Sequence, residues 1–224
     1  IPNGKNLGIK ITYTEQESPK GLPDAFLLGE KFINKKNVAL ILGDNFFYGQ
    51  NLTKILQDSA KLENGAKILL HKVRKPELYG VAKINNQNKI ISIKEKPKKF
   101  FSDLAVTGLY FFDKNVTQYA KKLKPSKRGE LEIVDLLNKY KKQKKLSANL
   151  IGRGGAWLDA GSIEDFYKTS SFVEAIENRQ GLKIACIEEI AFNYNWIGKK
   201  EINNSISFYG KCDYSNYLKK LQNI

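Results

Sequence analysis

The chain of 224 residues contains one histidine, two cysteines and no methionine. Neither cysteine, Cys186 or Cys212, has further Cys or His residues at a spacing that would complete a zinc site. With His71 as the only histidine, the composition argues against Ser-His-Asp, Cys-His and His-metal chemistry. So few cysteines also indicate a reducing compartment, and we expect a cytoplasmic protein.

Long apolar runs are absent as well. None approaches the length of about 20 residues that a membrane-spanning helix needs, and the sequence opens with no signal-peptide pattern. The hydrophobic content of 42% and aromatic content of 11% are typical of a globular chain with one sizeable core. We therefore expect no membrane partner.

Acidic residues are scarce, at 23 against 38 basic ones, which gives a net charge of +15. Such an excess is typical of nucleic-acid-binding proteins. The lysines are nevertheless spread along the chain, with local clusters at 94–99 and 139–145, and no aromatic-basic motif accompanies them. We expect no nucleic-acid partner, because a phosphorylated small-molecule substrate would favour a positive field equally well.

The most informative stretch is Val38-Ala39-Leu40-Ile41-Leu42-Gly43-Asp44-Asn45. Its five consecutive apolar residues predict a strand buried on both faces, as in a parallel sheet. Asp44 then lies at the carboxyl end of that strand, where open α/β sheets bind ligands. A carboxylate there suits a divalent cation that bridges phosphates, although an ordinary Asp-Asn turn explains the stretch equally well.

The remaining pattern alternates strands with helices and predicts an α/β fold with a mixed sheet. Residues 79–84 and 90–93 flank an Asn-rich turn and predict a hairpin, and Ser162 is expected to cap a long helix. Gly108 lies within a predicted strand, where a missing side chain allows the close approach of another backbone or a ligand. Further strands are predicted at 8–13, 67–73, 105–112, 148–151 and 184–187.

A second carboxylate, Asp159, also follows a strand-like stretch and precedes a glycine by two residues. Together with Asp44 it could hold one Mg²⁺, which borrows phosphate oxygens and waters as further ligands. Lys96 and Arg128 are natural phosphate partners, and Glu95 could accept hydrogen bonds from sugar hydroxyls. Each residue also has an ordinary structural explanation: a lysine-rich surface, a local ion pair or a helix cap.

Six motifs occur in order from about Gly8 to about Trp196, and together they are specific. Through them the chain resembles the bacterial glucose-1-phosphate thymidylyltransferases, or dTDP-glucose pyrophosphorylases, a family of nucleotidyltransferases. The motifs are Glu15-Gln16-Glu17-Ser18-Pro19-Lys20-Gly21-Leu22, Leu42-Gly43-Asp44-Asn45-Phe46, Glu95-Lys96-Pro97, Val106-Thr107-Gly108-Leu109-Tyr110, Arg128-Gly129-Glu130-Leu131-Glu132-Ile133 and Trp157-Leu158-Asp159-Ala160-Gly161.

The resemblance implies a Rossmann-like three-layer α/β/α core with a mixed sheet and an inserted sugar-binding β-subdomain. Residues 1–224 would form a single domain, with a helical extension at about 180–224. It also implies a Mg²⁺-dependent in-line reaction of dTTP with glucose 1-phosphate that yields dTDP-glucose and pyrophosphate. The family is homotetrameric, and its product enters the dTDP-rhamnose pathway.

The resemblance also assigns roles to individual residues. Gln16 and the backbone of Gly21 would read the thymine, and Asp44 and Asp159 would hold Mg²⁺. Catalysis would depend on Asp44 together with two residues that bind the sugar phosphate, Lys96 and Arg128. The glucose site would be lined by Gly80, Glu95 and Val106, and a second, regulatory nucleotide surface by Gly49 and Arg153.

The family's sequences open with a glycine-rich segment that contains Gly-Thr-Arg, and a lysine follows later. Together these bind the triphosphate. These 224 residues do not contain that segment. We therefore expect an N-terminally incomplete chain that lacks normal transferase activity by itself. Two other functions remain open: a UTP–glucose-1-phosphate uridylyltransferase, and a sugar-nucleotide-binding module without catalysis.

Overall fold

The computed structural model describes residues 3–87 and 89–221 of the chain. Contacts divide the chain into two compact units. One unit comprises residues 14–166, and the other comprises residues 1–13 together with 167–224. The boundary falls inside helix α6 (Ile163–Gln180).

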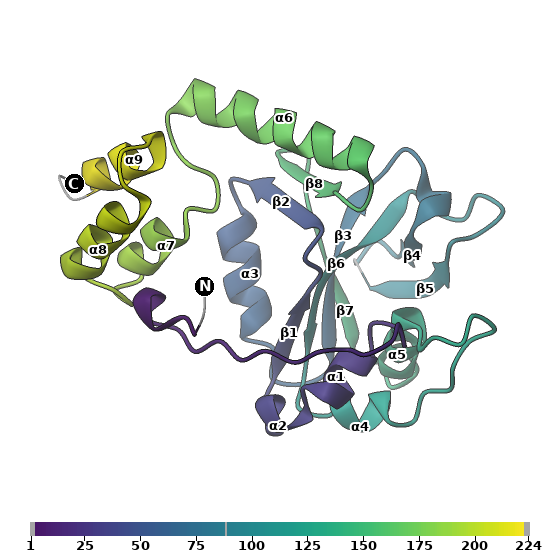
Figure 1. Ribbon diagram of the computed structural model, residues 1–224. Helices are drawn as coiled ribbons and strands as arrows, with labels where there is room; N and C mark the ends of the chain where they lie inside the picture. The colour runs from purple at the N-terminus through teal and green to yellow at the C-terminus, as the bar shows by residue number, and fades with distance from the viewer. Residues whose placement is uncertain (1–2, 88, 222–224) are drawn as a thin grey trace. The chain divides into compact units, whose positions relative to one another are not determined.

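The larger unit contains a six-stranded sheet in the order β5-β4-β6-β3-β7, with β1 paired to β6 (Figure 1). Only β3 and β7 run parallel and every other pairing is antiparallel, so the predicted mixed sheet is confirmed. The strands are β1 (Val38–Ile41), β3 (Ala66–Lys72), β4 (Gly80–Ile84), β5 (Ile90–Glu95), β6 (Leu104–Phe112) and β7 (Leu146–Leu150).

Strand β6 is the centre of this sheet, because every residue from Ala105 to Phe112 is buried. Its pairing with β3 runs along one edge. On the other edge β1 pairs with residues 109–112, and β4 bridges to Ala105. Gly108 therefore lies where β1 and β4 diverge, at an opening in the sheet.

Helices cover both faces of the sheet and give the expected three layers (Figure 1). The main core lies on one face, between the sheet and α1 (Asp24–Leu28), α2 (Glu30–Ile33), α4 (Val116–Ala120) and α5 (Ile133–Lys142). A smaller cluster on the other face packs Leu69, Leu109 and Phe111 against α3 (Leu52–Ala60) and strand β2 (Asn45–Gly49). The predicted α/β fold is confirmed.

Two pairs of strands carry most of the candidate functional residues. Strand β2 pairs antiparallel with β8 (Gly155–Asp159) in a separate two-stranded ribbon. Strands β4 and β5 form the predicted hairpin, which follows the short 3-10 helix η2 (Pro76–Leu78). Ser162 caps α6 as expected, because its Oγ accepts the Asp165 N–H at 3.1 Å.

Three predictions from sequence are wrong. Strand β1 pairs antiparallel with β6 and has alternating burial, and Ile41 is 59% exposed, because within the described residues β1 has a partner strand on one side only. Residues 9–13 form no strand, since Ile9 donates its N–H to Gly4 instead. Residues 184–187 turn at Ala185, whose φ is 53°, and enter a helix at Ile187.

The second unit is helical where it is described. Its core is formed by eight buried residues, including Leu7, Ile202 and Leu218. Besides the larger part of α6, its elements are the 3-10 helix η1 (Lys5–Leu7), α7 (Ile187–Asn193), α8 (Lys199–Tyr209) and α9 (Asp213–Leu221). Among the described residues, no helix combines the length and apolar character needed to cross a bilayer.

The main core should dominate the stability of the larger unit. Ile68 of β3 is fully buried, whereas Ile91 of β5 is 56% exposed. We expect Ile68→Ala to lower the free energy of unfolding by about 2–5 kcal/mol, because it removes apolar contacts and leaves a cavity. The same change at Ile91 should alter it by no more than about 0.5 kcal/mol. Urea denaturation of both variants tests this, and equal losses would contradict it.

Candidate active site

The ribbon of β2 and β8 brings Asp44 and Asp159 together. Asn45 pairs directly with Asp159, and the Ala160 N–H donates to the Asp44 carbonyl at 2.8 Å. Both carboxylates approach Gly161. A Cβ added at this glycine would lie 3.2 Å from Asp159 Oδ1 and 3.5 Å from Asp44 Oδ2. Two side chains far apart in sequence thus point to one position.

The electrostatics of this position favour a cation. Partial burial, followed by the charge of Asp44, raises the pKa of the Asp159 carboxyl, and the charge of Asp165 acts in the same direction. The Gly161 N–H and the charge of Lys96 oppose the rise. Within the described residues no group of three or more His, Cys, Asp or Glu side chains could hold a metal. A metal bound here would therefore need phosphate oxygens and waters to complete its shell, which is how Mg²⁺ usually binds.

The side chain of Asn45 fixes the position of Asp44. Its Nδ2 donates to Asp44 Oδ1 at 2.9 Å, while its Oδ1 accepts the Trp157 Nε1–H at 2.6 Å and the Gly108 N–H at 2.8 Å. A close approach was expected at Gly108 from another backbone or a ligand, and the group that the structure places there is the Asn45 side chain. Asn45 connects β2, β8 and β6, a role that the sequence did not indicate.

Two aromatic rings from other segments pack against Trp157 of the ribbon. The Trp157 ring lies 5.1 Å from Tyr79 and 6.3 Å from His71, both edge-on. Burial lowers the pKa of His71, so its ring is neutral at pH 7. The Tyr79 hydroxyl has a raised pKa because of burial first and then the charges of Asp159 and Asp165, which places Tyr79 beside the carboxylates.

The β4–β5 hairpin places Gly80 opposite Glu95. A Cβ added at Gly80 would lie 3.1 Å from Glu95 Oε2 and 3.4 Å from Val134 Cγ2, so a larger residue would push the carboxylate by a few tenths of an ångström. Partial burial raises the pKa of Glu95, and the charge of Glu132 adds to it, whereas Lys96 and Arg128 lower it. Glu95 is therefore surrounded by charges of both signs.

Lys96 follows β5 with a φ of 36°, in the left-handed region that lysine seldom adopts. Such a conformation costs on the order of 1–3 kcal/mol and is often found at functional sites. Its N–H donates to the Tyr79 carbonyl at 3.0 Å, which fixes the backbone. The charge of Lys96 lowers the pKa of Glu95, Glu132 and Asp159, yet its ammonium has no hydrogen-bond partner among the described residues.

Arg128 belongs to a turn that a Gly129-to-Ser126 backbone hydrogen bond closes. Its guanidinium binds Glu132 through Nη2, at 3.0 Å from Oε1 and 2.9 Å from Oε2. Although burial opposes it, hydrogen bonds from Ser126 and Arg128 lower the pKa of Glu132. Glu132 was not predicted as part of the site, although it belongs to the same sequence motif as Arg128.

Gln16 and Gly21 belong to the segment before α1. Gln16 Nε2 donates to Asp24 Oδ2 at 2.7 Å. Gly21 has a φ of 90°, and a Cβ there would lie 2.1 Å from the Leu131 carbonyl. Leu131 also donates its N–H to Lys20 at 2.8 Å. The expected base-reading segment is thus anchored to the segment that carries Arg128.

The structure therefore gathers Asp44, Asp159, Glu95 and Lys96, with Arg128 close enough to shift the Glu95 pKa. Val106 is 7% exposed and packs in the main core, which also contains Val134 and Tyr110. Burial and then the charge of Glu95 raise the pKa of the Tyr110 hydroxyl. Gly49 pairs with Gly155 at the opposite end of the ribbon from Asp44. The exposed Arg153 precedes Gly155 by two residues.

The contact at Gly108 can be tested directly. In Gly108→Ala the new Cβ would lie 2.5 Å from Asn45 Oδ1, so the amide must move and lose its hydrogen bonds. We expect a loss of about 1–3 kcal/mol in the free energy of unfolding. Gly152→Ala is the control, since its Cβ would meet open space. Equal unfolding free energies for the two variants in urea would contradict the contact.

The raised pKa of Asp159 predicts a pH dependence. The folded chain holds this proton more tightly than the unfolded chain, so stability falls as the pH rises from 3.8 through the higher folded value. Asp159→Asn cannot ionise. In EDTA at pH 7 its thermal midpoint should equal or exceed that of the parent chain, and the difference should disappear in acid. A less stable variant at pH 7 would contradict the like-charge pair.

Comparison with known proteins places these residues in a family context. The family model for nucleotidyl transferases matches residues 1–176. A glucose-1-phosphate thymidylyltransferase from Neisseria meningitidis is 45% identical over 221 residues, which are 99% of this chain and 77% of that protein. The protein of the same name from Xanthomonas campestris pv. campestris (strain B100) is 43% identical over 99% of this chain and 75% of its own.

Solved structures give the same result for the fold. A crystal structure assigned to a glucose-1-phosphate thymidylyltransferase from Bacillus anthracis, in complex with sucrose, matches with a TM-score of 0.67 and 40% identity over 76% of this chain and 68% of that one. A UDP-glucose pyrophosphorylase in complex with UDP-glucose matches with a TM-score of 0.65 and 26% identity, over 73% and 66% of the two chains.

Proposed function

Because the chain belongs to the nucleotidyl transferase family, we propose that it serves to join dTTP and glucose 1-phosphate into dTDP-glucose and pyrophosphate. The observation that carries the proposal is the meeting of the Asp44 and Asp159 carboxylates beside Gly161, within the field of Lys96. The name shared by its relatives supports the choice of base and sugar.

The reaction is a displacement at phosphorus. An oxygen of the glucose 1-phosphate attacks the α-phosphorus of dTTP, a new P–O bond forms, and the bond from the α-phosphorus to the oxygen that bridges to the β-phosphate breaks. Pyrophosphate leaves with that bridging oxygen. No covalent enzyme intermediate is required, so the protein contributes positioning and charge neutralisation.

The sugar phosphate is assigned to Lys96 and Arg128. The Lys96 ammonium has no hydrogen-bond partner in the described residues, and its strained backbone fixes where the side chain begins. Arg128 presents a planar fork that Glu132 already holds in a bidentate manner. A phosphate would compete with Glu132 for that fork, since both anions match its geometry. Both cations reduce the repulsion between the attacking phosphate and the triphosphate.

Asp44 and Asp159 are assigned to Mg²⁺. Their carboxylate oxygens are the hard ligands that this ion prefers, and their mutual repulsion is relieved when a cation binds. Bound there, the ion would neutralise negative charge on the reacting phosphates. Asn45 holds Asp44 through Nδ2 and so keeps the Asp44 carboxylate oriented towards Gly161.

The glucose and the thymine are assigned to different segments of the chain. Glucose would rest on the hairpin, with Glu95 accepting hydrogen bonds from hydroxyls and Gly80 leaving the space that a side chain would fill. Val106, which packs in the main core, would line the glucose site with them. Thymine would be read by Gln16 and by the backbone at Gly21, next to the segment that carries Arg128.

The second candidate function is the same chemistry with UTP. The match to a UDP-glucose pyrophosphorylase favours it, at lower sequence identity than the thymidylyltransferases show. The proposal also includes a cytoplasmic homotetramer that supplies the dTDP-rhamnose pathway; these parts rest on the family resemblance. Light scattering of the purified protein measures the oligomeric state.

A thermal-shift titration tests the proposed substrates. A ligand that binds only the folded chain must raise the melting midpoint. With Mg²⁺ present, dTDP-glucose should raise it more than UDP-glucose or glucose 1-phosphate does. The rise should disappear in Lys96→Ala and Glu95→Gln and persist in Lys99→Ala, a control at a nearby exposed lysine.

Three outcomes oppose the assignment. A larger shift with UDP-glucose would favour the uridylyltransferase. A shift that survives Lys96→Ala would place the ligand elsewhere. If pyrophosphate release from dTTP and glucose 1-phosphate stayed absent even in a longer form that carries the family's glycine-rich segment, the chain would be a binding module.

A further inference from the structure

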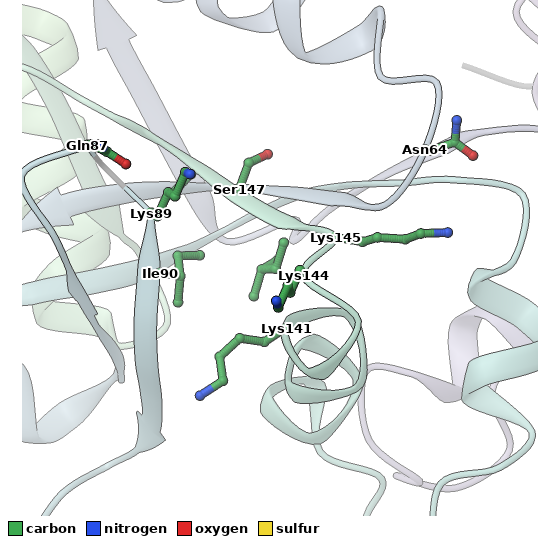
Figure 2. A pocket seen from close by; sticks show the side chains of 10 residues that line it. Asn64, Gln87, Lys89, Ile90, Lys141, Lys144, Lys145 and Ser147 are labelled. Carbon is green, nitrogen blue, oxygen red and sulfur yellow. The ribbon is translucent and has the colours of Figure 1, made fainter.

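A basic cavity lies in the larger unit, away from the Asp44 and Asp159 carboxylates. It has a volume of about 630 Å³ and lies at the start of β5 and β7 and the end of α5 (Figure 2). Lys89, Lys141, Lys144 and Lys145 line it, and no acidic residue of the described chain does. Figure 2 shows Lys89 beside Ser147 and Lys144 at the end of the helix, while the Lys141 and Lys145 side chains extend in different directions.

The charges around this cavity are uncompensated. None of the four lysines forms an ion pair with a described residue, although Lys141 Nζ donates to the Ile91 carbonyl at 2.9 Å. Like charges gathered in one place repel one another, and an anion between them removes that cost. Cations in the last turn of a helix are ordinarily favourable, which accounts for Lys141. This helix-end effect does not account for Lys89, which precedes β5.

Contacts with Ser147 and Asn85 fix the backbone of Lys89 at the cavity. Lys89 forms an antiparallel bridge with Ser147. Its N–H donates to Asn85 Oδ1 at 2.9 Å, and its carbonyl accepts the Asn85 N–H at 3.0 Å. Lys144, across from it, has a φ of 59° in the turn that follows α5. The two lysines therefore start from fixed positions on separate elements.

The cavity is separate from the proposed substrate site. Strand β5 begins at the cavity with Ile90 and ends at Glu95, next to Lys96. Six residues of a strand span about 17 Å. Helix α5 likewise begins beside Glu132 and ends at the cavity. An anion bound between Lys89 and Lys144 would not reach Asp44 or Asp159.

We propose that this cavity binds a multiply charged phosphate anion, either pyrophosphate itself or a phosphate ester. Its volume is within the range of about 300–1,000 Å³ that small-molecule sites occupy, and is more than a single phosphate fills. Ile90 and Leu146 give part of its wall an apolar character that the organic group of an ester would contact. The proposal does not depend on the reaction proposed above.

Isothermal titration calorimetry with sodium pyrophosphate, in the absence of divalent cations, tests the site. The variant Lys89→Gln/Lys144→Gln should weaken binding about tenfold or more, because charge-assisted hydrogen bonds are lost. The control Lys54→Gln/Lys124→Gln changes the net charge equally at exposed lysines outside the cavity and should weaken it less than about twofold. Lys96→Ala should retain this binding, which separates the site from the proposed substrate site.

Equal affinity in the parent chain and the Lys89/Lys144 variant would overturn the proposal, as would loss of binding in Lys96→Ala alone or no binding by the parent chain. The double variant removes like charges, so its melting midpoint without ligand should equal or exceed that of the parent. If it does not fold, the single change Lys89→Gln gives the same test, since Lys89 is an exposed residue. Its affinity should then fall while that of Lys54→Gln is retained.

Discussion

The amide of Asn45 is the contact on which the site depends. One side chain accepts hydrogen bonds from Trp157 on β8 and Gly108 on β6, and donates to Asp44. The small ribbon is thereby tied to the central strand of the large sheet at the point where β1 and β4 diverge. Without that amide, Asp44 would lose the hydrogen bond that orients its carboxylate, and the ribbon would keep only its apolar packing on the sheet.

Around this contact, charges of opposite sign are separated by the fold. Asp44 and Asp159 form one centre, where burial first and then the charge of Asp44 raise the pKa of Asp159. Lys96 and Arg128 form another, beside Glu95 and Glu132. The first centre is negatively charged, and in the second the Lys96 ammonium has no hydrogen-bond partner among the described residues. A phosphate held by the cations and a cation held by the carboxylates would satisfy both, which is the charge pattern that phosphoryl-transfer chemistry needs.

The sequence predicted the fold class and the β4–β5 hairpin because these depend on local apolar patterns and turn residues. It mispredicted the environment of β1, since five apolar residues indicate burial but not which strands are present to provide it; Ile41 is in fact exposed. The proximity of Asp44 and Asp159 was expected from two strand ends. The contacts of Asn45 and the Arg128–Glu132 pair were not, because they depend on the register of β2 with β8 and on one side-chain rotamer.

The proposed site requires that the Asp44 and Asp159 carboxylates and Lys96 share one phosphate-bearing ligand. Anomalous scattering from a crystal grown with dTDP-glucose and Mn²⁺, as a stand-in for Mg²⁺, measures this most directly. We predict a single metal peak between the Asp44 and Asp159 carboxylates, with a ligand phosphate within hydrogen-bond distance of Lys96 Nζ. A metal peak remote from both carboxylates, or a diphosphate bound away from Lys96, would contradict the account.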